Sequence, residues 1–301
     1  MADLEPAAAS GRPGEPAGRT FAGEAGPAGG EAKHMSPPPV EVRDVRGVAE
    51  LRACQALQRR AWGITEDGYV VPVATMAAAQ KVGGLVLGAY EAGQVVGFSF
   101  AFLGRVRGAL VLYSQLTAVD PDRRGRGIGR YLKLEQRRRA REMGLPAVAW
   151  VFDPLQASNA AFNLAVLGTS SRAYEVDLYG PRTDPLNAGL DTDRLLAEWP
   201  TSGEPGGRRE RWPDGVELVE AVPRPDGLRR PAAVRTVPPG APWLHVEIPA
   251  DINAVKAADL ELACAWQRAV RDALLPAFDA GYVAVGFARG DSPCYLLERA
   301  A

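Results

Sequence analysis

The stretch Leu116-Thr117-Ala118-Val119-Asp120-Pro121-Asp122-Arg123-Arg124-Gly125-Arg126-Gly127-Ile128-Gly129-Arg130-Tyr131-Leu132 decides the fold. Its apolar start predicts the end of a strand, which the Asp-Pro-Asp segment terminates. The glycines that follow predict a tight turn leading directly into a helix. This order places free N–H groups and the positive end of the helix dipole at the turn, where an anion binds favourably.

We expect the glycine turn to bind a diphosphate. Gly127 and Gly129 carry no side chains, so a diphosphate can approach the main chain. Arg124, Arg126 and Arg130 add positive charge around the turn. The stretch has neither the GxGxxG pattern of dinucleotide-binding turns nor the GxxxxGK pattern of nucleoside-triphosphate loops. An ordinary glycine turn beside a solvated basic surface stays open as the alternative.

Strand and helix patterns alternate on both sides of this turn. The predicted elements are a helix at 48–62, strands at 85–90, 95–103 and 109–119, a helix at 129–143, a strand at 147–152, a helix at 159–167, and strands at 171–179 and 195–199. The first two strands are joined by Glu91-Ala92-Gly93-Gln94, which is typical of a hairpin. This order predicts an α/β (α+β) fold with a mixed, mostly antiparallel sheet flanked by helices.

Composition divides the chain into four parts. Residues 1–40 are dominated by Ala, Gly and Pro and predict a disordered tail, whereas residues 41–200 form the main domain. Residues 201–215 are rich in Pro, Gly and Arg and predict a linker to a smaller C-terminal α/β extension at 216–301. The extension is predicted to contain strands at 216–222, 232–237 and 243–248, a long helix at 254–278, and strands at 282–287 and 294–297.

The overall composition excludes several classes of protein. The formal net charge of −1 argues against a protein that coats nucleic acid or an anionic membrane. Three distant cysteines and two histidines make a disulfide framework, a metal site or a histidine triad improbable. The sequence has no apolar run of about 18 residues and no secretory signal, so we expect a cytoplasmic protein.

The motif and its surroundings resemble the GNAT superfamily of acyl-CoA-dependent N-acyltransferases. Members carry Gln or Arg, then Gly three residues later and Gly or Ala two residues after that, matched here by Arg124, Gly127 and Gly129. A later helix often begins with Asn and closes with Leu-Gly, matched by Asn159 and Leu167-Gly168. The resemblance covers about residues 40–199 and implies acetyl-CoA or another acyl-CoA as co-substrate, with no metal.

The resemblance assigns cofactor contacts along the strand, the turn and the second helix. The cofactor-binding residues it implies are Thr117, Ala118, Val119, Arg124, Gly125, Arg126, Gly127, Ile128, Gly129, Arg130, Asn159 and Phe162. The strand backbone at 117–119 would hold the acyl carbonyl and the pantetheine amide. A main-chain N–H there would stabilise the oxyanion that forms as the amine attacks.

A narrower resemblance joins the chain to an uncharacterised bacterial GNAT branch with a C-terminal extension. It rests on the segments 113–115, 152–160, 162–164, 167–168, 179–180, 184–187 with Gly189, 192–194 and 246–251. Links between some relatives and N-acylamino-acid racemases imply amino acids as acceptors. Asn187, Asp193 and Arg194 are the candidate acceptor-binding residues, and Arg194 is expected to pair either with an acceptor carboxylate or with Asp191 or Asp193.

The sequence departs from the family at the groups that move protons. Many members have a Tyr acid where this chain has Leu164, and residues 109–119 contain no Asp or Glu to act as base. The narrower branch often has His where Gln115 stands, and Gln cannot exchange a proton at neutral pH. Tyr113 and Gln115 are the remaining catalytic candidates, although Tyr113 also fits a cross-strand aromatic. Transfer by positioning, with water carrying the proton, stays open.

Three further features have structural explanations that we favour over functional ones. The basic run of Arg137, Arg138, Arg139 and Arg141 predicts a solvated helix face, with contact to the CoA 3′-phosphate as the alternative. Nucleic-acid binding ranks third, because no aromatic stacking pattern accompanies the run. Asp153 lies between a strand and a helix, where a turn or cap is expected. Asn159 is expected to cap the second helix, with a pantetheine contact as the further option.

The sequence therefore predicts transfer of an acyl group, with acetyl favoured, from CoA to a primary amine of a small molecule such as an amino acid. A longer acyl group or a protein amine is the alternative within enzymes. A non-catalytic acyl-CoA-binding or interaction protein with a degenerate GNAT site is the alternative from another class. We expect no nucleic-acid or membrane partner. The C-terminal extension is expected to extend the sheet, cover the acceptor site or form a homodimer contact.

Overall fold

The computed structural model describes residues 40–204 and 213–300. The tail predicted at 1–40 lies outside the described residues except for its last residue, and so does most of the linker predicted at 201–215. The elements before that gap are β1 (Glu41–Asp44), α1 (Gly47–Trp62), η1 (Asp67–Tyr69), α2 (Val73–Lys81), β2 (Leu85–Glu91), β3 (Gln94–Val106), β4 (Ala109–Val119), η2 (Pro121–Arg123), α3 (Ile128–Glu142), β5 (Ala147–Phe152), α4 (Ala157–Ala160), the π-helical η3 (Ala161–Leu167), β6 (Ser170–Glu175) and β7 (Arg194–Pro200).

The C-terminal part adds strands to the same sheet rather than building a second one of similar size. Its elements are β8 (Val216–Glu217), β9 (Val219–Pro223), β10 (Arg229–Val234), β11 (Trp243–Glu247), α5 (Ile252–Ala258), α6 (Leu260–Asp279), β12 (Tyr282–Ala288) and β13 (Cys294–Arg299). The large sheet has 11 strands in the order β1-β2-β3-β4-β5-β7-β6-β12-β13-β11-β8, and β9 pairs with β10 separately. The two parts join where Ala284 of β12 pairs with Ser171 of β6.

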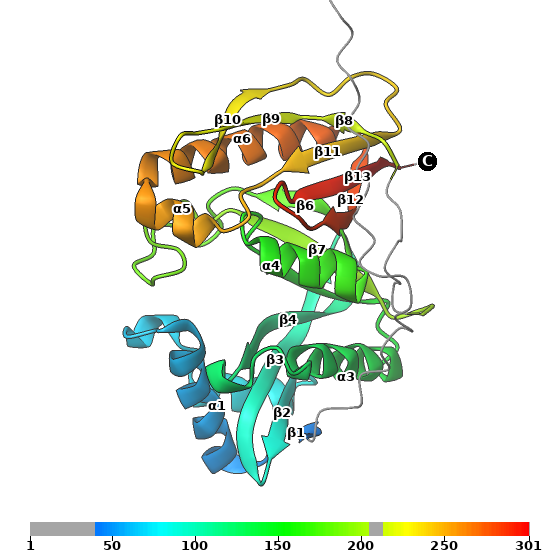
Figure 1. Cartoon of the computed structure of the whole chain (residues 1–301). Coiled ribbons are helices and arrows are strands. Elements are labelled where there is room, and N and C mark those ends of the chain that lie inside the picture. The colour runs from blue at the N-terminus through cyan, green and yellow to red at the C-terminus, as the bar shows by residue number, and fades with distance from the viewer. Residues whose placement is uncertain (1–39, 205–212, 301) are drawn as a thin grey trace, which may run out of the picture.

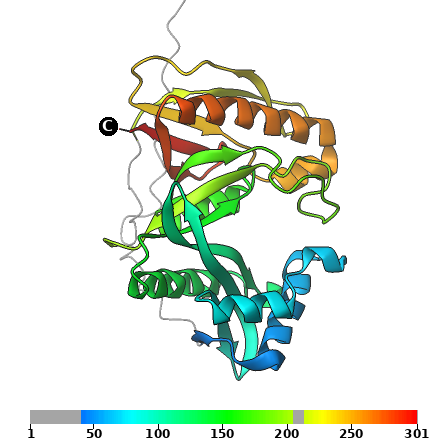
Figure 2. The same cartoon turned by 180° about the vertical axis from the view of Figure 1, so that it is seen from behind.

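The sheet is mixed and mostly antiparallel, as the sequence predicts. Only β4–β5 and β8–β11 pair in parallel among the described strands. Figure 1 shows α3 and α4 in front of the sheet. In Figure 2, which shows the molecule from behind, α2 and α6 lie in front of the sheet. The apolar faces of these helices therefore bury both sides of the sheet, which is the arrangement expected of an α/β fold.

Apolar residues at matching positions explain how the central helices pack. In α1, the buried Leu51, Cys54 and Leu57 recur at helical spacing and pack against Phe98 and Phe100 of β3. On the opposite face, Ile128 and Leu132 of α3 pack against Leu87 and Ala89 of β2. The second of these contacts fixes the start of α3 against the sheet, and with it the glycine turn.

Two strand predictions hold with the same bounds, and several others needed correction. β4 and β5 match the predicted 109–119 and 147–152. The helix α2 was missed because its Ala-rich sequence buries only Met76 and Ala79 and has no clear apolar stripe. The helix predicted at 254–278 was wrong, because Asp259 adopts an extended conformation between α5 and α6. Its carboxylate accepts a hydrogen bond from Leu262 N at 2.9 Å and caps the second helix.

Two predicted strands in the outer sheet end or begin elsewhere. The strand predicted at 171–179 ends at Glu175, because Asp177 takes a left-handed backbone conformation with φ 46°. The Asp177 carboxylate accepts a hydrogen bond from Thr192 N at 3.0 Å, which closes the loop at its base. The strand predicted at 232–237 begins earlier, at Arg229, whose guanidinium is held by Glu247 of β11.

Candidate functional site

The strands β4 and β5 diverge part-way along their length, and we call the interval between them the slot. These strands pair only at Leu112 with Val148 and at Tyr113 with Ala149. Beyond this point, the edge of β4 that faces β5 has no strand partner within the described residues, up to Val119. Unpaired main-chain groups along a strand edge are a template for a ligand that carries amides.

A β-bulge lies at the narrow end of this slot. Phe100 of β3 pairs with Leu116, but the next residue, Ala101, pairs with Ser114, so Gln115 has no opposite residue. A bulge bends the strand and re-aims the main-chain groups beside it. The sequence does not reveal this bulge, because no Gly or Pro marks it. Gln115 is half-buried, and its side chain makes no hydrogen bond with the described residues.

The glycine turn lies at the wide end of the slot, where β4 ends. Gly125 and Gly127 have φ values of 77° and 81°, which glycine adopts without the strain that other residues incur. Gly127 is the N-cap of α3, so the N–H groups of the first helical turn point towards the space beyond it. Gly129 has ordinary helical geometry, and an added Cβ would lie 3.8 Å from Val119 Cγ2. A conformational need for glycine therefore exists at Gly127 and not at Gly129.

The three arginines assigned to the turn are all exposed, but they differ in their contacts. Arg124 Nη2 donates to the carbonyl of Ala61 at the end of α1. Arg126 lies 3.8 Å from the carboxylate of Glu91. Arg130 is exposed and forms no ion pair or side-chain hydrogen bond with another described residue, so its charge is available to a ligand at the turn.

Tyr113 lies on the α1 side of the sheet, at the narrow end of the slot. Its ring centroid is 5.4 Å from that of Phe102 on β3, so the cross-strand aromatic role is realised. Burial, together with the neighbouring Tyr179, raises the pKa of Tyr113 above its ordinary value. The hydroxyl therefore holds its proton more tightly than a free tyrosine and is a poor acid or base near neutral pH.

Arg194 is a buried cation beside Tyr113. The residue is 9% exposed; Nη1 donates to the carbonyl of Asp193 at 2.7 Å, and Nη2 donates to Asn187 Oδ1 at 2.6 Å. Its guanidinium carbon lies 5.3 Å from the centroid of the Tyr179 ring. Across the described parts of the chain, no carboxylate forms an ion pair with Arg194. The structure thus brings Asn187 and Arg194 together, as two of the three predicted acceptor-binding residues.

The third predicted residue, Asp193, has a structural role instead. Its carboxylate is 1% exposed and accepts hydrogen bonds from Tyr174 at 2.6 Å and from Arg271 at 2.8 Å. Arg271 also pairs with Asp191 at 2.7 Å. Of the two alternatives for Arg194, a salt bridge with Asp191 or Asp193 is therefore wrong, because Arg271 of α6 pairs with both carboxylates.

The α3 side of the slot contains a polar group that the sequence did not single out. Lys133 is 4% exposed; its Nζ lies 2.9 Å from Ser114 Oγ and 3.6 Å from the centroid of the Trp150 ring. Ser114 Oγ in turn donates to Gln136 Oε1 at 2.9 Å. Burial lowers the pKa of Lys133 well below its ordinary value. The signal in the sequence is a lysine between Leu132 and Leu134, and the many arginines of the same helix obscure it.

The helix predicted at 159–167 starts earlier than predicted, at Ala157. Asn159 does not cap it, because α4 begins at Ala157, and the Asn159 side chain is exposed within the first turns. Phe162 is half-buried and packs against the main core, and Leu164 is 3% exposed. Asp153 forms the expected turn, because its Oδ1 accepts a hydrogen bond from Leu155 N at 2.8 Å. Burial raises the pKa of this carboxyl.

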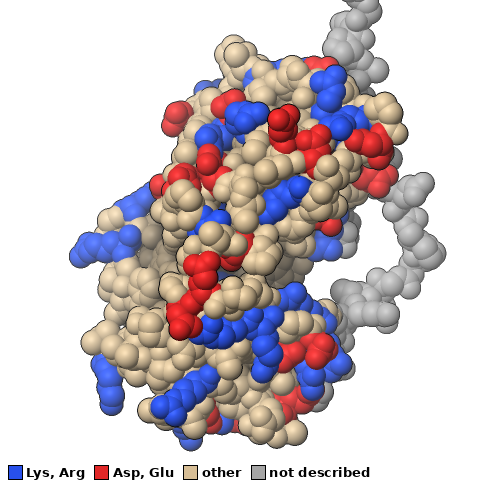
Figure 3. Space-filling model, turned by 90° about the vertical axis from the view of Figure 1, so that its left-hand side faces the viewer, with Lys and Arg blue, Asp and Glu red and all other residues tan. Residues whose placement is uncertain are grey.

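The basic run on α3 is not uniformly solvated. Arg138 is exposed and pairs with Glu135 at 2.7 Å, as expected for a solvated face. Arg137 is buried, and its guanidinium donates to the carbonyls of Pro200, Ser202 and Gly203. The favoured interpretation is therefore wrong for Arg137, which anchors the end of β7. Figure 3 shows Lys and Arg side chains interspersed with Asp and Glu on the face viewed there.

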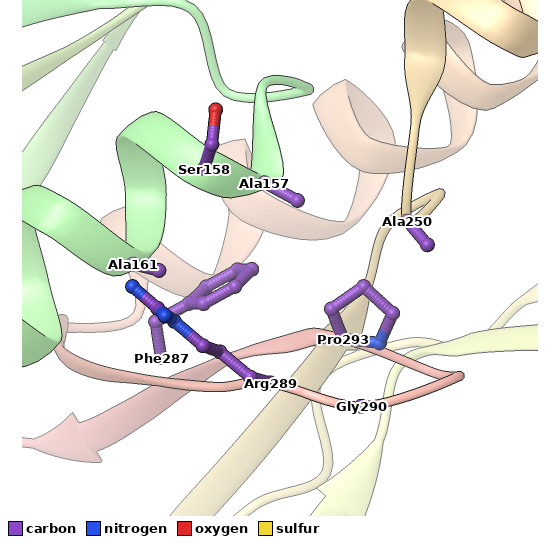
Figure 4. Close-up of a pocket in the computed structure, with 8 residues that line it drawn as sticks. All are labelled: Ala157, Ser158, Ala161, Ala250, Phe287, Arg289, Gly290 and Pro293. Atoms are coloured by element: carbon purple, nitrogen blue, oxygen red, sulfur yellow. The ribbon is translucent and has the colours of Figure 1, made fainter. Parts of the chain in front are cut away.

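A separate pocket lies between α4 and the loop that joins β12 to β13. It has a volume of about 260 Å³ and is lined by Ala157, Ser158, Ala161, Ala250, Phe287, Arg289, Gly290 and Pro293. Figure 4 shows the ring of Phe287 and the side chain of Arg289 beside Ala161. Residues 40–204 and 213–300 contain no cluster of His, Cys, Asp and Glu suited to a metal ion. No helix in these ranges is long and apolar enough to cross a membrane.

Comparison with known proteins agrees with the sequence resemblance. Residues 51–165 match the family model described as Acetyltransferase (GNAT) family. No curated protein matches the chain. Solved structures with a similar fold include the ribosomal-protein-S18-alanine N-acetyltransferase from Escherichia coli, with 18% identity over 58% of this chain and 99% of that chain and a TM-score of 0.43.

Two further solved structures show a similarity of the same size. The ribosomal-protein-alanine N-acetyltransferase from Brucella melitensis has 22% identity over 52% of this chain and 98% of that chain, with a TM-score of 0.43. The phosphinothricin acetyltransferase from Sinorhizobium meliloti, in complex with AcCoA, has 20% identity over 58% of this chain and 97% of that chain, with a TM-score of 0.43. The part of the chain that contains the slot and the glycine turn belongs to the GNAT family of acetyltransferases.

Proposed function

We propose that the protein transfers an acyl group, with acetyl favoured, from acyl-CoA to a primary amine of a small molecule. The observation that carries this proposal is the continuous path from the bulge at Gln115, along the open edge of β4, to the turn at Gly127. The open edge offers main-chain partners to the amides of pantetheine. The helix N-terminus beyond it suits the diphosphate.

The bulge supports the placement of the reacting carbonyl. A main-chain N–H freed from the ladder at the narrow end of the slot is suited to stabilise the negative charge that develops on the thioester oxygen. The amine approaches from the α1 side, where Tyr113, Asn187 and Arg194 lie. This geometry allows attack on the carbonyl without a covalent enzyme intermediate.

Arg194 supports an acceptor that carries a carboxylate, such as an amino acid. A buried guanidinium is costly unless an anion or several acceptors satisfy it. Here it donates to two neutral oxygens, and the described residues provide no carboxylate partner for it. A bound carboxylate would pair with the remaining N–H groups of the fork.

The alternative function is acyl-CoA binding without catalysis. Leu164 stands where many family members have a Tyr acid, and Gln115 cannot exchange a proton. Under this alternative, acyl-CoA binds in the same slot, but no amine releases free thiol from it.

The experiment has two stages. Isothermal titration with acetyl-CoA and CoA tests binding. Ligand at 100 times its Kd should also raise the free energy of unfolding by about 2.7 kcal/mol. Thiol release is then measured with a panel of amines that pairs each amino acid with its amide. We expect turnover with free amino acids and a KM at least about 10-fold higher for the amides, since each lost charged hydrogen bond costs about 1.5–3 kcal/mol. Absence of binding would refute both functions, and binding without thiol release would favour the alternative.

A further inference from the structure

Lys133 is a buried lysine without a carboxylate partner. Its Nζ contacts Ser114 Oγ and the face of Trp150, and no Asp or Glu in the described residues lies within ion-pair distance. The indole face recovers part of the cost of burying an ammonium, but it does not replace a counterion. A lysine held in this way is unusual unless its proton or its charge is used.

Ser114 connects this lysine to the slot. It is the residue immediately before the bulge at Gln115 and immediately after the last β4 residue that pairs with β5. Trp150 is likewise the first β5 residue beyond that pair. The Ser114 hydroxyl therefore lies at the narrow end of the slot, on the side of the sheet that α3 covers.

Polar atoms around this group lack partners within the protein. Gln136 Nε2 and Thr117 Oγ1 are buried, and neither has a hydrogen-bond partner among the described residues. Thr117 lies on the same face as Ser114, because their partners Ser99 and Ala101 are two residues apart on β3. Buried polar atoms in proteins nearly always have partners, so these atoms point to a ligand or water in the slot.

The reaction requires a proton at this place. When the thioester breaks, the departing sulfur takes the electron pair of the C–S bond and needs a proton. Leu164 and Gln115 cannot supply one, and Tyr113 lies on the other side of the sheet with a raised pKa. Burial lowers the pKa of Lys133, which moves it towards the range in which an amine exchanges protons near neutral pH.

We propose that the Ser114 hydroxyl, which donates to Gln136 Oε1 in this structure, turns to protonate the departing thiolate, and that Lys133 replaces the proton that Ser114 gives up. As the C–N bond forms and the C–S bond breaks, the sulfur takes the Ser114 proton and the serine oxygen takes one from the Lys133 ammonium. The acceptor nitrogen loses its proton to solvent, and solvent reprotonates Lys133 before the next turnover. Ser114 is then a catalytic residue, and Lys133 is a positioning residue that acts through it.

This inference rests on the proposed transferase function. It is tested with Ser114→Ala, Lys133→Met and Lys133→Arg, each measured for KM and for the rate of a single turnover between pH 6 and 9.5. Single turnovers are used because product release can mask the chemical step. Arginine keeps the positive charge but does not release a proton, so Lys133→Arg separates charge from proton supply.

We expect all three variants to lose about 100-fold in rate, with the KM for acetyl-CoA changed by about 2-fold or less. The wild-type rate should fall at high pH as Lys133 loses its proton, and this fall should vanish in Lys133→Met. Lys81→Met, on the exposed end of α2, is the control and should keep the wild-type rate and pH profile.

Each other outcome overturns a defined part of the proposal. A Ser114→Ala variant that keeps its rate at every pH would remove the catalytic role of Ser114. A Lys133→Arg variant with full activity would show that only the charge matters. If the wild type binds acetyl-CoA but transfers nothing to any amine, the proposed function itself is wrong, and this inference falls with it.

Discussion

The side chain of Lys133 shows how burial alone can lower the pKa of a lysine. The same lysine on the exposed face of α3 would be a solvated cation, like Arg138 on that helix. Its position against Trp150 and Ser114 instead removes water without supplying a carboxylate. Its stability effect should therefore depend on pH in a way that a surface lysine does not show.

Replacement of Lys133 by Met should stabilise the protein more at low pH than at high pH. Because the pKa is lowered in the folded state, the unfolded chain binds more protons between that pKa and about 10.4. The wild type therefore gains stability as pH rises through this window, by up to about 1.4 kcal/mol per pH unit. Urea unfolding of both proteins from pH 6 to 10 measures the difference.

The gap in unfolding free energy between Lys133→Met and the wild type should shrink as pH increases. Lys81→Met is the control, because Lys81 is exposed and its replacement should leave the pH dependence unchanged. A gap for Lys133→Met that stays constant over the whole range would show that Lys133 titrates like an exposed lysine.

At the scale of elements, the strand–turn–helix unit was the most predictable part of the molecule. β4 has its predicted bounds, α3 begins one residue earlier than predicted, and Gly127 has the positive φ that its turn requires. The bulge in β4 and the divergence of β4 from β5 were not predicted from the sequence. A bulge is a mismatch between two strands, so it depends on which residue pairs with which and not on either strand alone.

Gly127→Trp should abolish measurable binding of acetyl-CoA, because the indole would fill the space at the N-terminus of α3. The matched control is Gly144→Trp, at the other end of the same helix, where φ is 73° and an added Cβ meets open space. Both variants incur a similar backbone strain of about 1–2 kcal/mol. Titration calorimetry should therefore show lost affinity for Gly127→Trp alone. If Gly127→Trp retains its affinity for acetyl-CoA, the diphosphate does not bind at this turn.

At the scale of the whole molecule, the C-terminal extension and the GNAT-family part share one sheet and one core. The core cluster contains Trp150 and Trp199 from the first part and Trp266 and Tyr295 from the second. Arg271 of α6 reaches across to Asp193, which is 1% exposed. The loop between β6 and β7, which carries Asn187, is thereby held by the C-terminal part.

Arg271→Met should destabilise the whole molecule by about 3 kcal/mol, because it leaves the buried Asp193 carboxylate without its cation. The control is Arg235→Met, because the pair of Arg235 with Glu220 is about half exposed on both sides and contributes less than about 1 kcal/mol. Chemical unfolding, followed by circular dichroism, gives both values. A loss for Arg271→Met no larger than that of the control would show that this contact does not join the two parts energetically.

The sequence by itself determined the local units of this protein. The glycine pattern between a strand and a helix, apolar residues at helical spacing and the order of strands were enough to predict the turn, α1, β4, β5 and the mixed sheet, because these features arise from neighbours in the chain. The tertiary structure alone decided what each polar side chain meets. Arg194 faces neutral oxygens because Arg271 holds the nearby carboxylates, and Lys133 lies against Ser114 because α3 packs over the bulge. Such contacts join residues from different elements, and burial and pairing set their chemistry, so a linear pattern does not record them.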